Sequence, residues 1–182
     1  SSFRNNSNGD DFLNFFRSKN IKLQNLEFEN ILNDAIDSDF SELEIVDSKF
    51  NNIGNDTIDG SGSTIVIKNN IFSNVQDKAI SAGENSSFKI LASYFNSNEL
   101  ALVSKDGSKI KSTSNIFTNN NLDFASFVKK KFYGPSETTF NNDKIKSFLI
   151  EEKSIVKGLD SISYSYNVES KLYGNLYGKA SQ

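Results

Sequence analysis

A phenylalanine returns every 22 or 23 residues along this 182-residue chain, and this period constrains the fold more than any other feature. The phenylalanine column consists of Phe28, Phe50, Phe72, Phe95 and Phe117. A small polar residue follows two places later each time, at Asn30, Asn52, Asn74, Ser97 and Asn119. Two apolar columns keep the same step, namely Ile21, Leu43, Ile65, Phe88 and Ile110, and Ile36, Ile58, Ile80 and Leu102. Several columns that share one period are typical of a solenoid.

One repeat, residues 43–64, shows what each coil contains. Three short stretches alternate apolar with polar residues, and Asp, Asn, Ser and Gly lie between them. Alternation with a period of two indicates strands, and these four residue types favour turns. Strands this short become stable by pairing in parallel with their copies in the next coil, about 4.8 Å away. The sequence therefore predicts an all-β fold, a parallel β-helix with coils of 22–23 residues.

The repeated columns have structural interpretations. The phenylalanine rings are expected to stack inside the solenoid, because aromatic side chains at this spacing pack on one another. The asparagine column is expected in tight turns, where each amide bonds the backbone and the asparagine of the next coil and satisfies buried polar groups.

The period also divides the chain. Regular coils are expected over residues 21–131, drawn as 21–42, 43–64, 65–87, 88–109 and 110–131. Residues 1–20 are expected to form a degenerate coil that continues a longer chain, since the sequence has neither a starting Met nor an apolar leader. Residues 132–182 lose the period, and irregular coils with a C-terminal cap are expected there, because a cap protects exposed strand edges. The repeated Leu172-Tyr173-Gly174 and Leu176-Tyr177-Gly178 are expected at or beyond the last coil.

Composition excludes several classes of function. The net charge of −3 without a basic stripe argues against nucleic-acid binding. The sequence contains no run of about 18 apolar residues, so no membrane-spanning helix is expected. The chain has no His and no Cys, which excludes thiol nucleophiles, zinc–thiolate sites and Ser–His–Asp triads. Catalysis would have to use Asp, Glu, Lys, Tyr or Arg. A metal site would have to use oxygen ligands, which favour Ca²⁺ or Mg²⁺.

Aspartates gather just before the third apolar column. Aligning the coils stacks Asp11, Asp34 and Asp56 and then Lys78, with Asp37 and Asp59 beside them. Carboxylates about 5 Å apart repel by roughly 3 kcal/mol at an effective dielectric of about 20, so the column needs a counter-charge. Lys78 or Lys105 supplies it in one interpretation, and a Ca²⁺ ion held by several oxygens supplies it in another. In a third interpretation these are ordinary turns in which Asp accepts backbone N–H bonds.

Five stretches resemble a known family. Residues 33–39, 55–63, 77–86, 103–108 and 130–134 resemble, in this order, a subgroup of bacterial β-helix repeat modules in the pectin-lyase-like superfamily of right-handed parallel β-helices. Such modules often form the C-terminal part of large exported proteins. The resemblance therefore implies a right-handed helix and an extracellular or cell-surface location, and it implies no defined activity.

Many members of the wider superfamily act on polysaccharides. In the calcium-dependent pectate lyases, clustered aspartates bind Ca²⁺, and a Lys or Arg takes the proton α to the uronate carboxylate. By this resemblance Lys78, ahead of Lys105, is the candidate base. The candidate metal ligands are Asp34, Asp37, Asp56 and Asp59. The chain departs from the pectate lyases in having no Arg near the cluster, and from the polygalacturonases in having no His.

Two functions follow from these observations. The first is a non-catalytic, exported scaffold that presents a flat face to a polysaccharide, a cell-envelope component or another domain of a longer chain. The second is a calcium-dependent polysaccharide lyase that uses the stacked aspartates and a lysine. An open groove on which Asp37, Asp59 and Lys78 converge would favour the enzyme.

Overall fold

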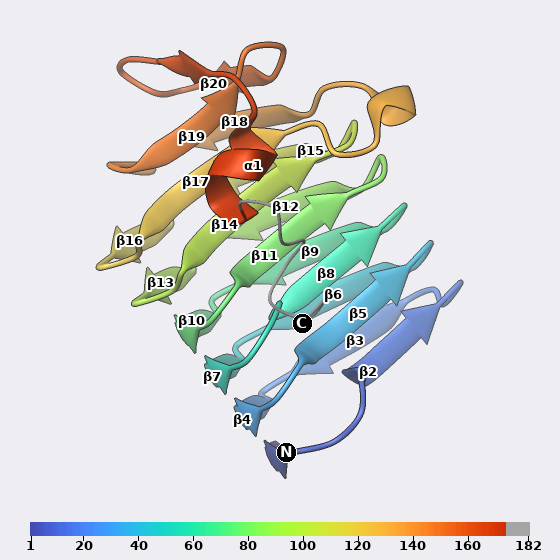
Figure 1. Ribbon diagram of the computed structural model, residues 1–182. Coiled ribbons are helices and arrows are strands. Elements are labelled where there is room, and N and C mark those ends of the chain that lie inside the picture. The colour runs from blue at the N-terminus through green and yellow to red at the C-terminus, as the bar shows by residue number, and fades with distance from the viewer. Residues whose placement is uncertain (174–182) are drawn as a thin grey trace.

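The computed structural model describes residues 1–173, and in this part the chain winds into a parallel β-helix (Figure 1). Each regular coil contributes one strand to each of three parallel sheets, and the strands of a sheet pair with their copies in the adjacent coils. The predicted fold class is confirmed. The short strands are stable because every one of them has a neighbour at the spacing of a sheet.

Sheet A carries the phenylalanine column and consists of β1 (Ser2–Asn6), β4 (Glu27–Ile31), β7 (Lys49–Ile53), β10 (Ile71–Val75), β13 (Tyr94–Asn96) and β16 (Ile116–Thr118). Sheet B consists of β2 (Asp11–Phe16), β5 (Asp34–Asp39), β8 (Ile58–Ser61), β11 (Lys78–Gly83), β14 (Leu100–Lys105), β17 (Leu122–Phe127), β19 (Phe148–Glu151) and β21 (Tyr164–Ser165). Sheet C consists of β3 (Ile21–Gln24), β6 (Glu42–Val46), β9 (Thr64–Lys68), β12 (Ser87–Leu91), β15 (Lys109–Thr113), β18 (Glu137–Asn141) and β20 (Ile155–Lys157).

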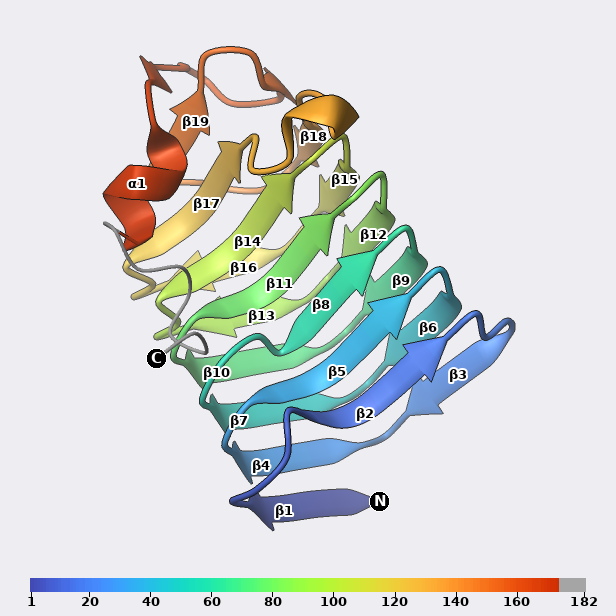
Figure 2. The ribbon, with the colours of Figure 1, turned by 45° about the vertical axis from the view of Figure 1, so that its right-hand side comes forward.

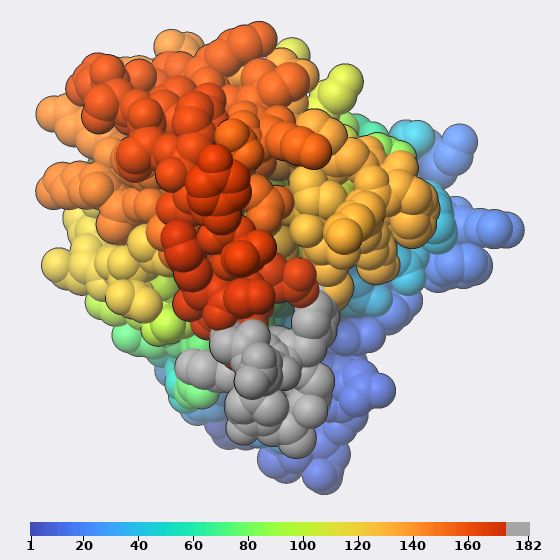
Figure 3. Space-filling view, turned by 45° about the horizontal axis from the view of Figure 1, so that its top comes forward, coloured from blue at the N-terminus to red at the C-terminus, as the bar shows by residue number. Residues whose placement is uncertain are grey.

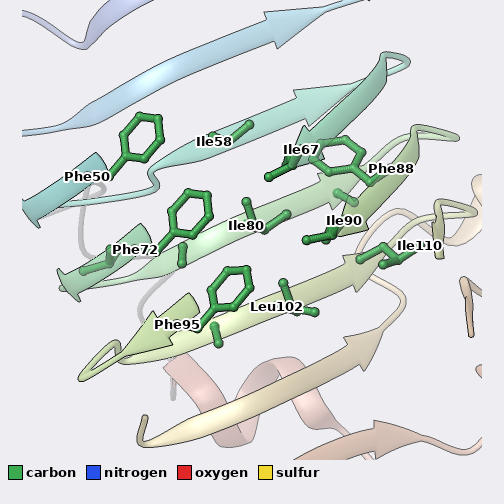
Figure 4. Packing of buried hydrophobic residues seen from close by; sticks show 14 of the residues in the cluster. Phe50, Ile58, Ile67, Phe72, Ile80, Phe88, Ile90, Phe95, Leu102 and Ile110 are labelled. Atoms are coloured by element: carbon green, nitrogen blue, oxygen red, sulfur yellow. The ribbon is translucent and has the colours of Figure 1, made fainter. Parts of the chain in front are cut away.

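The core is a set of parallel side-chain stacks that run along the helix axis (Figure 4). The rings of the phenylalanine column are buried, and successive centroids lie 4.8–5.1 Å apart with interplanar angles of 2–12°. The isoleucine column that ends at Leu102 is fully buried and pairs in register. Each coil therefore adds one side chain to each column, and several such columns together fill the interior.

The asparagine column has a different role from the one expected. Asn30, Asn52 and Asn74 are solvent-exposed and adopt a left-handed conformation, with φ values of 57–58°. Asparagine tolerates this region better than most residues, so the column turns the chain from sheet A towards sheet B. The expected amide bond between coils is present, since Asn52 Nδ2 donates to Asn30 Oδ1 at 2.7 Å, but it lies at the surface.

Buried polar groups are satisfied by another set of side chains. Ser48 and Ser63 accept hydrogen bonds from backbone N–H groups one coil earlier, and the buried amides of Asn70 and Asn115 do the same. These residues face inward where sheet B meets sheet C and where sheet C meets sheet A. The interior of each such turn is thus hydrogen-bonded from coil to coil.

The two ends of the helix depart from the regular step. At the N-terminal end, β1 and β2 extend sheets A and B, and Phe3 pairs with Phe28 at a separation of 25 residues. After β17 a loop containing the 3-10 helix η1 (Lys131–Tyr133) leads into β18, and shorter strands continue sheets B and C.

The last described element, the α-helix α1 (Val168–Tyr173), lies against the side of the β-helix (Figure 2). Leu172 and Tyr173 were expected at or beyond the last coil, yet Tyr173 lies beside Asp77 and Lys78, several coils back. The reason is an apolar patch on the outer face of sheet B that α1 covers. Residues 174–178 of the Leu-Tyr-Gly repeat lie outside the described residues. Within residues 1–173 no helix has the length and apolar character that crossing a membrane requires.

Replacing Phe72 with alanine should lower the free energy of unfolding by about 3–5 kcal/mol, because it removes a fully buried ring from the middle of the stack. Denaturant unfolding followed by circular dichroism measures this change. Ile71→Ala is the matched control, since the neighbouring side chain is 38% exposed and should cost far less. Equal stabilities for the two variants would contradict the assigned register.

Candidate functional site

The residues singled out in the sequence lie on or beside the outer face of sheet B. Three columns of side chains run along this face. The first contains Asp11, Asp34, Asp56, Lys78, Leu100 and Leu122. The second contains Asn14, Asp37, Asp59, Ser81, Val103 and Ala125. The third contains Phe16, Asp39, Ser61, Gly83, Lys105 and Phe127. The face is therefore acidic in the first three coils, mixed in the fourth and mostly apolar beyond it.

In the first column, Asp34 and Asp56 act as turn residues. Asp34 Oδ1 accepts hydrogen bonds from the Asp56 backbone N–H at 2.9 Å and from Asn55 Nδ2 at 2.6 Å. Asp56 Oδ1 accepts one from the Lys78 backbone N–H at 3.1 Å. Burial and the neighbouring Asp56 carboxylate raise the pKa of Asp34 to about 8. These two carboxyl groups are thus committed to the turns between sheets A and B.

Lys78 supplies the counter-charge of the first column. Its side chain is buried, and Nζ lies 2.9 Å from Asp56 Oδ1 and also bonds the Asp77 carboxylate. Burial alone would lower the pKa of Lys78, but Asp56 and Asp77 outweigh it and raise the pKa well above its ordinary value. The Tyr173 ring lies 5.4 Å from the ammonium. A lysine held charged between two carboxylates is a poor proton acceptor.

The second column contains the more accessible pair, Asp37 and Asp59. Burial and the Asp59 carboxylate raise the pKa of Asp37 to about 7, and Asn14 Nδ2 donates to Asp37 at 2.8 Å. Burial would also raise the pKa of Asp59, but the Lys105 ammonium, 4.0 Å away, lowers it. The side chain of Asp59 is 28% exposed. This pair therefore combines a carboxyl group that holds a proton near neutral pH with a charged carboxylate.

The four aspartates named as metal ligands form two separate pairs. Asp34 and Asp37 lie three residues apart on β5, which corresponds to about 10 Å along a strand. Across residues 1–173 no three carboxylates converge into a group that could hold a metal ion.

A loop from the far end of β17 adds basic residues to the same face. The backbone N–H groups of Lys129 and Lys130 both donate to Asp106 Oδ1, at 2.8 and 2.6 Å, and the Lys130 side chain forms an ion pair with Glu84. Burial and the nearby charges of Lys105 and Lys130 lower the pKa of Lys129 to about 8. In the sequence, residues 130–134 stood out only for the family resemblance that they carry, because only the folded chain brings Lys130 beside Glu84.

An exposed aromatic pair ends the acidic part of the face. Phe16 and Phe40 are each 58% exposed, and their rings meet edge to face at 6.4 Å. The Arg17 guanidinium lies 5.1 Å from the Phe16 ring centre. Sequence reasoning missed this pair because the two residues differ by one position in register, so the regular step does not align them.

The apolar end of the face is closed by α1 (Figure 3). Val168 and Leu172 pack against Leu100, Val103 and Phe127. The part of the face not covered by this packing comprises the acidic first three coils and the aromatic pair.

Three parallel sheets, each built from successive coils of one chain, define the molecule as a parallel β-helix. The family model described as the right-handed beta helix region matches residues 3–173, and the chain belongs to this family. No curated protein and no solved structure matches the chain significantly.

Replacing Lys78 with methionine should destabilise the fold by about 3–5 kcal/mol at neutral pH, because Asp56 and Asp77 lose their buried counter-charge. Adding Asp56→Asn should recover part of the loss, since an amide needs no cation. Lys22→Met is the control, because the Lys22–Glu44 pair is half-exposed and contributes at most about 1 kcal/mol. An unchanged unfolding curve for Lys78→Met would show that the buried ion pairs do not hold this turn.

Proposed function

We propose that this chain is a non-catalytic, exported β-helix scaffold that binds a glycan of the cell envelope or extracellular matrix on the outer face of sheet B, beside the patch that α1 covers. The observation that carries the proposal is the exposed pair Phe16 and Phe40 next to Asp37 and Asp39. Exposed rings are costly to keep in water and are typical of sites where a partner covers them.

The chemistry of this face suits a sugar. An aromatic ring packs against the C–H face of a pyranose, and the hydroxyl groups around the ring seek hydrogen-bond partners. Asp37, whose pKa is raised to about 7, donates a hydrogen bond when protonated and accepts one when ionised. Asp59 stays charged and accepts.

A scaffold agrees with the environment of the lysines better than an enzyme does. Lys78, the first candidate base, is buried and paired with two carboxylates. The four aspartates lie in two pairs, and the first pair is bound to backbone N–H groups. Binding without catalysis requires none of these groups to be free.

Replacing Phe16 and Phe40 together with alanine should weaken glycan binding by about tenfold or more, equivalent to roughly 1.4 kcal/mol, because the apolar platform is lost. Retention on insoluble polysaccharides and calorimetry with their soluble fragments measure the change. Phe132→Ala is the matched control, since Phe132 is an 81% exposed ring that packs on Tyr133, with ring centres 4.2 Å apart, and is not part of the Phe16–Phe40 pair. Equal binding by both variants, or no glycan retained by the parent protein, would overturn the proposal.

A calcium-dependent lyase acting on uronate polymers is the second candidate. It is favoured by Lys105, 4.0 Å from Asp59, and by Lys129, whose lowered pKa of about 8 suits a proton acceptor. The lysine amine would take the proton α to the uronate carboxylate, and the bond to the leaving sugar oxygen would break, giving an unsaturated product.

If the lyase proposal is correct, Ca²⁺ should raise the melting temperature, and Asp37→Asn with Asp59→Asn should abolish the rise. The unsaturated product should appear by its ultraviolet absorbance, and Lys105→Ala should remove it. A melting temperature that does not respond to Ca²⁺, together with no unsaturated product, would exclude the lyase and favour the scaffold function.

A further inference from the structure

A shallow groove follows the corner where sheet A turns into sheet B, parallel to the helix axis. It has two adjoining stretches of about 430 and 470 Å³, and both include Asn52 and Gln76. Amides dominate its lining, among them Asn6, Asn30, Asn52, Asn74, Asn119 and Asn121. The groove is distinct from the aromatic pair, which lies where sheet B ends.

The left-handed asparagines create this concave corner. Asn30, Asn52 and Asn74 have φ values of 57–58°, so the chain bends at the same point in every coil. At Gly54, just after the bend, an added Cβ would lie 1.9 Å from the Leu32 carbonyl oxygen, so adjacent coils touch at the floor. The same bend repeated from coil to coil gives a continuous groove.

The amides keep hydrogen-bonding capacity for a ligand. Asn52 Nδ2 donates to Asn30 Oδ1, and Asn30 Nδ2 donates to Asn5 Oδ1 at 3.0 Å. In the next coil Asn74 Nδ2 donates to Asn51 Oδ1 at 2.9 Å instead of to Asn52. A primary amide has two N–H donors and a carbonyl with two lone pairs. Asn30 donates one bond and accepts one, so it keeps one donor and one lone pair, and Asn52 and Asn74 each keep a donor. Because these side chains are exposed, the remaining groups are available from the solvent side.

The spacing of the coils along the groove indicates what rise per unit a bound polymer should have. The phenylalanine rings two residues before the amides are spaced 4.8–5.1 Å apart, and the amides rise with the same coils. One pyranose ring adds a similar length to an extended β-1,4-linked chain. An extended peptide rises by about 3.3 Å per residue, which does not match one residue per coil.

The charge of the groove indicates which kind of polysaccharide it could bind. Among the described residues that line it, none is basic and Glu99 is the charged one. A uronate polymer would find no cation there and would meet the Glu99 carboxylate. Leu32, 52% exposed, offers an apolar contact for a sugar C–H face.

We propose that this amide groove is a second binding surface, which takes an uncharged, extended β-1,4-linked polysaccharide aligned with the helix axis. Each sugar unit bonds the amides of one coil through its hydroxyl groups. The proposal stands whether or not the face of sheet B binds a glycan.

The test is calorimetry with cello-, chito-, manno- and xylo-oligosaccharides, each from the disaccharide to the hexasaccharide. At least one series should bind with an affinity that rises with each added sugar. Asn52→Gly with Asn74→Gly should weaken this binding by about tenfold, because it removes amides while keeping the left-handed backbone. The control is Asn25→Gly with Asn69→Gly, two exposed left-handed asparagines at the corner between sheets C and A.

Several outcomes would contradict the proposal that the groove binds a polysaccharide. No binding by any of the four series would do so, as would equal losses in the two glycine variants or tighter binding of oligogalacturonates. The variant Phe16→Ala with Phe40→Ala separates the two surfaces. If it loses oligosaccharide binding and Asn52→Gly with Asn74→Gly does not, the glycan lies on sheet B, and the groove proposal fails while the proposed function survives.

Discussion

Every coil of this protein is held by the coils beside it, so in-register parallel pairing is the interaction on which the rest depends. A strand of two to six residues has no stability of its own. The phenylalanine stack, with centroids 4.8–5.1 Å apart, shows how closely side chains follow the backbone register. A shift by one residue would turn each apolar column out of the core.

The same pairing acts on the outside of the helix. Side chains that repeat along the sequence are brought within about 5 Å of one another whether or not they attract. For Asp37 and Asp59, burial and this proximity raise the pKa of Asp37. Lys105, 4.0 Å from Asp59, partly neutralises the negative charge of the pair. For the asparagines it produces a ladder of amides along one corner. A β-helix therefore converts a sequence period into lines of like chemistry on its surface, which is the geometry that an extended polymer requires.

The proposed functional surfaces were predictable to different degrees. The stacking of Asp37 on Asp59 follows from the repeat alone, since both occupy the same place in consecutive coils. The burial of Lys78 between Asp56 and Asp77 did not follow, because it depends on side-chain direction and on Tyr173 from the far end of the chain. The amide ladder was expected, but its position at the surface was not, because Asn52 was assigned to buried turns.

By itself the sequence determined the solenoid, its period, its inward columns and the coil-to-coil alignment of its aspartates. These features depend on local alternation and on a constant step, and both can be read along the chain. Only the tertiary structure decided where α1 lies, that Lys130 reaches Glu84, and that the left-handed asparagines open a groove. The irregular segments carry no period, so their contacts depend on which apolar and charged patches the finished helix leaves uncovered.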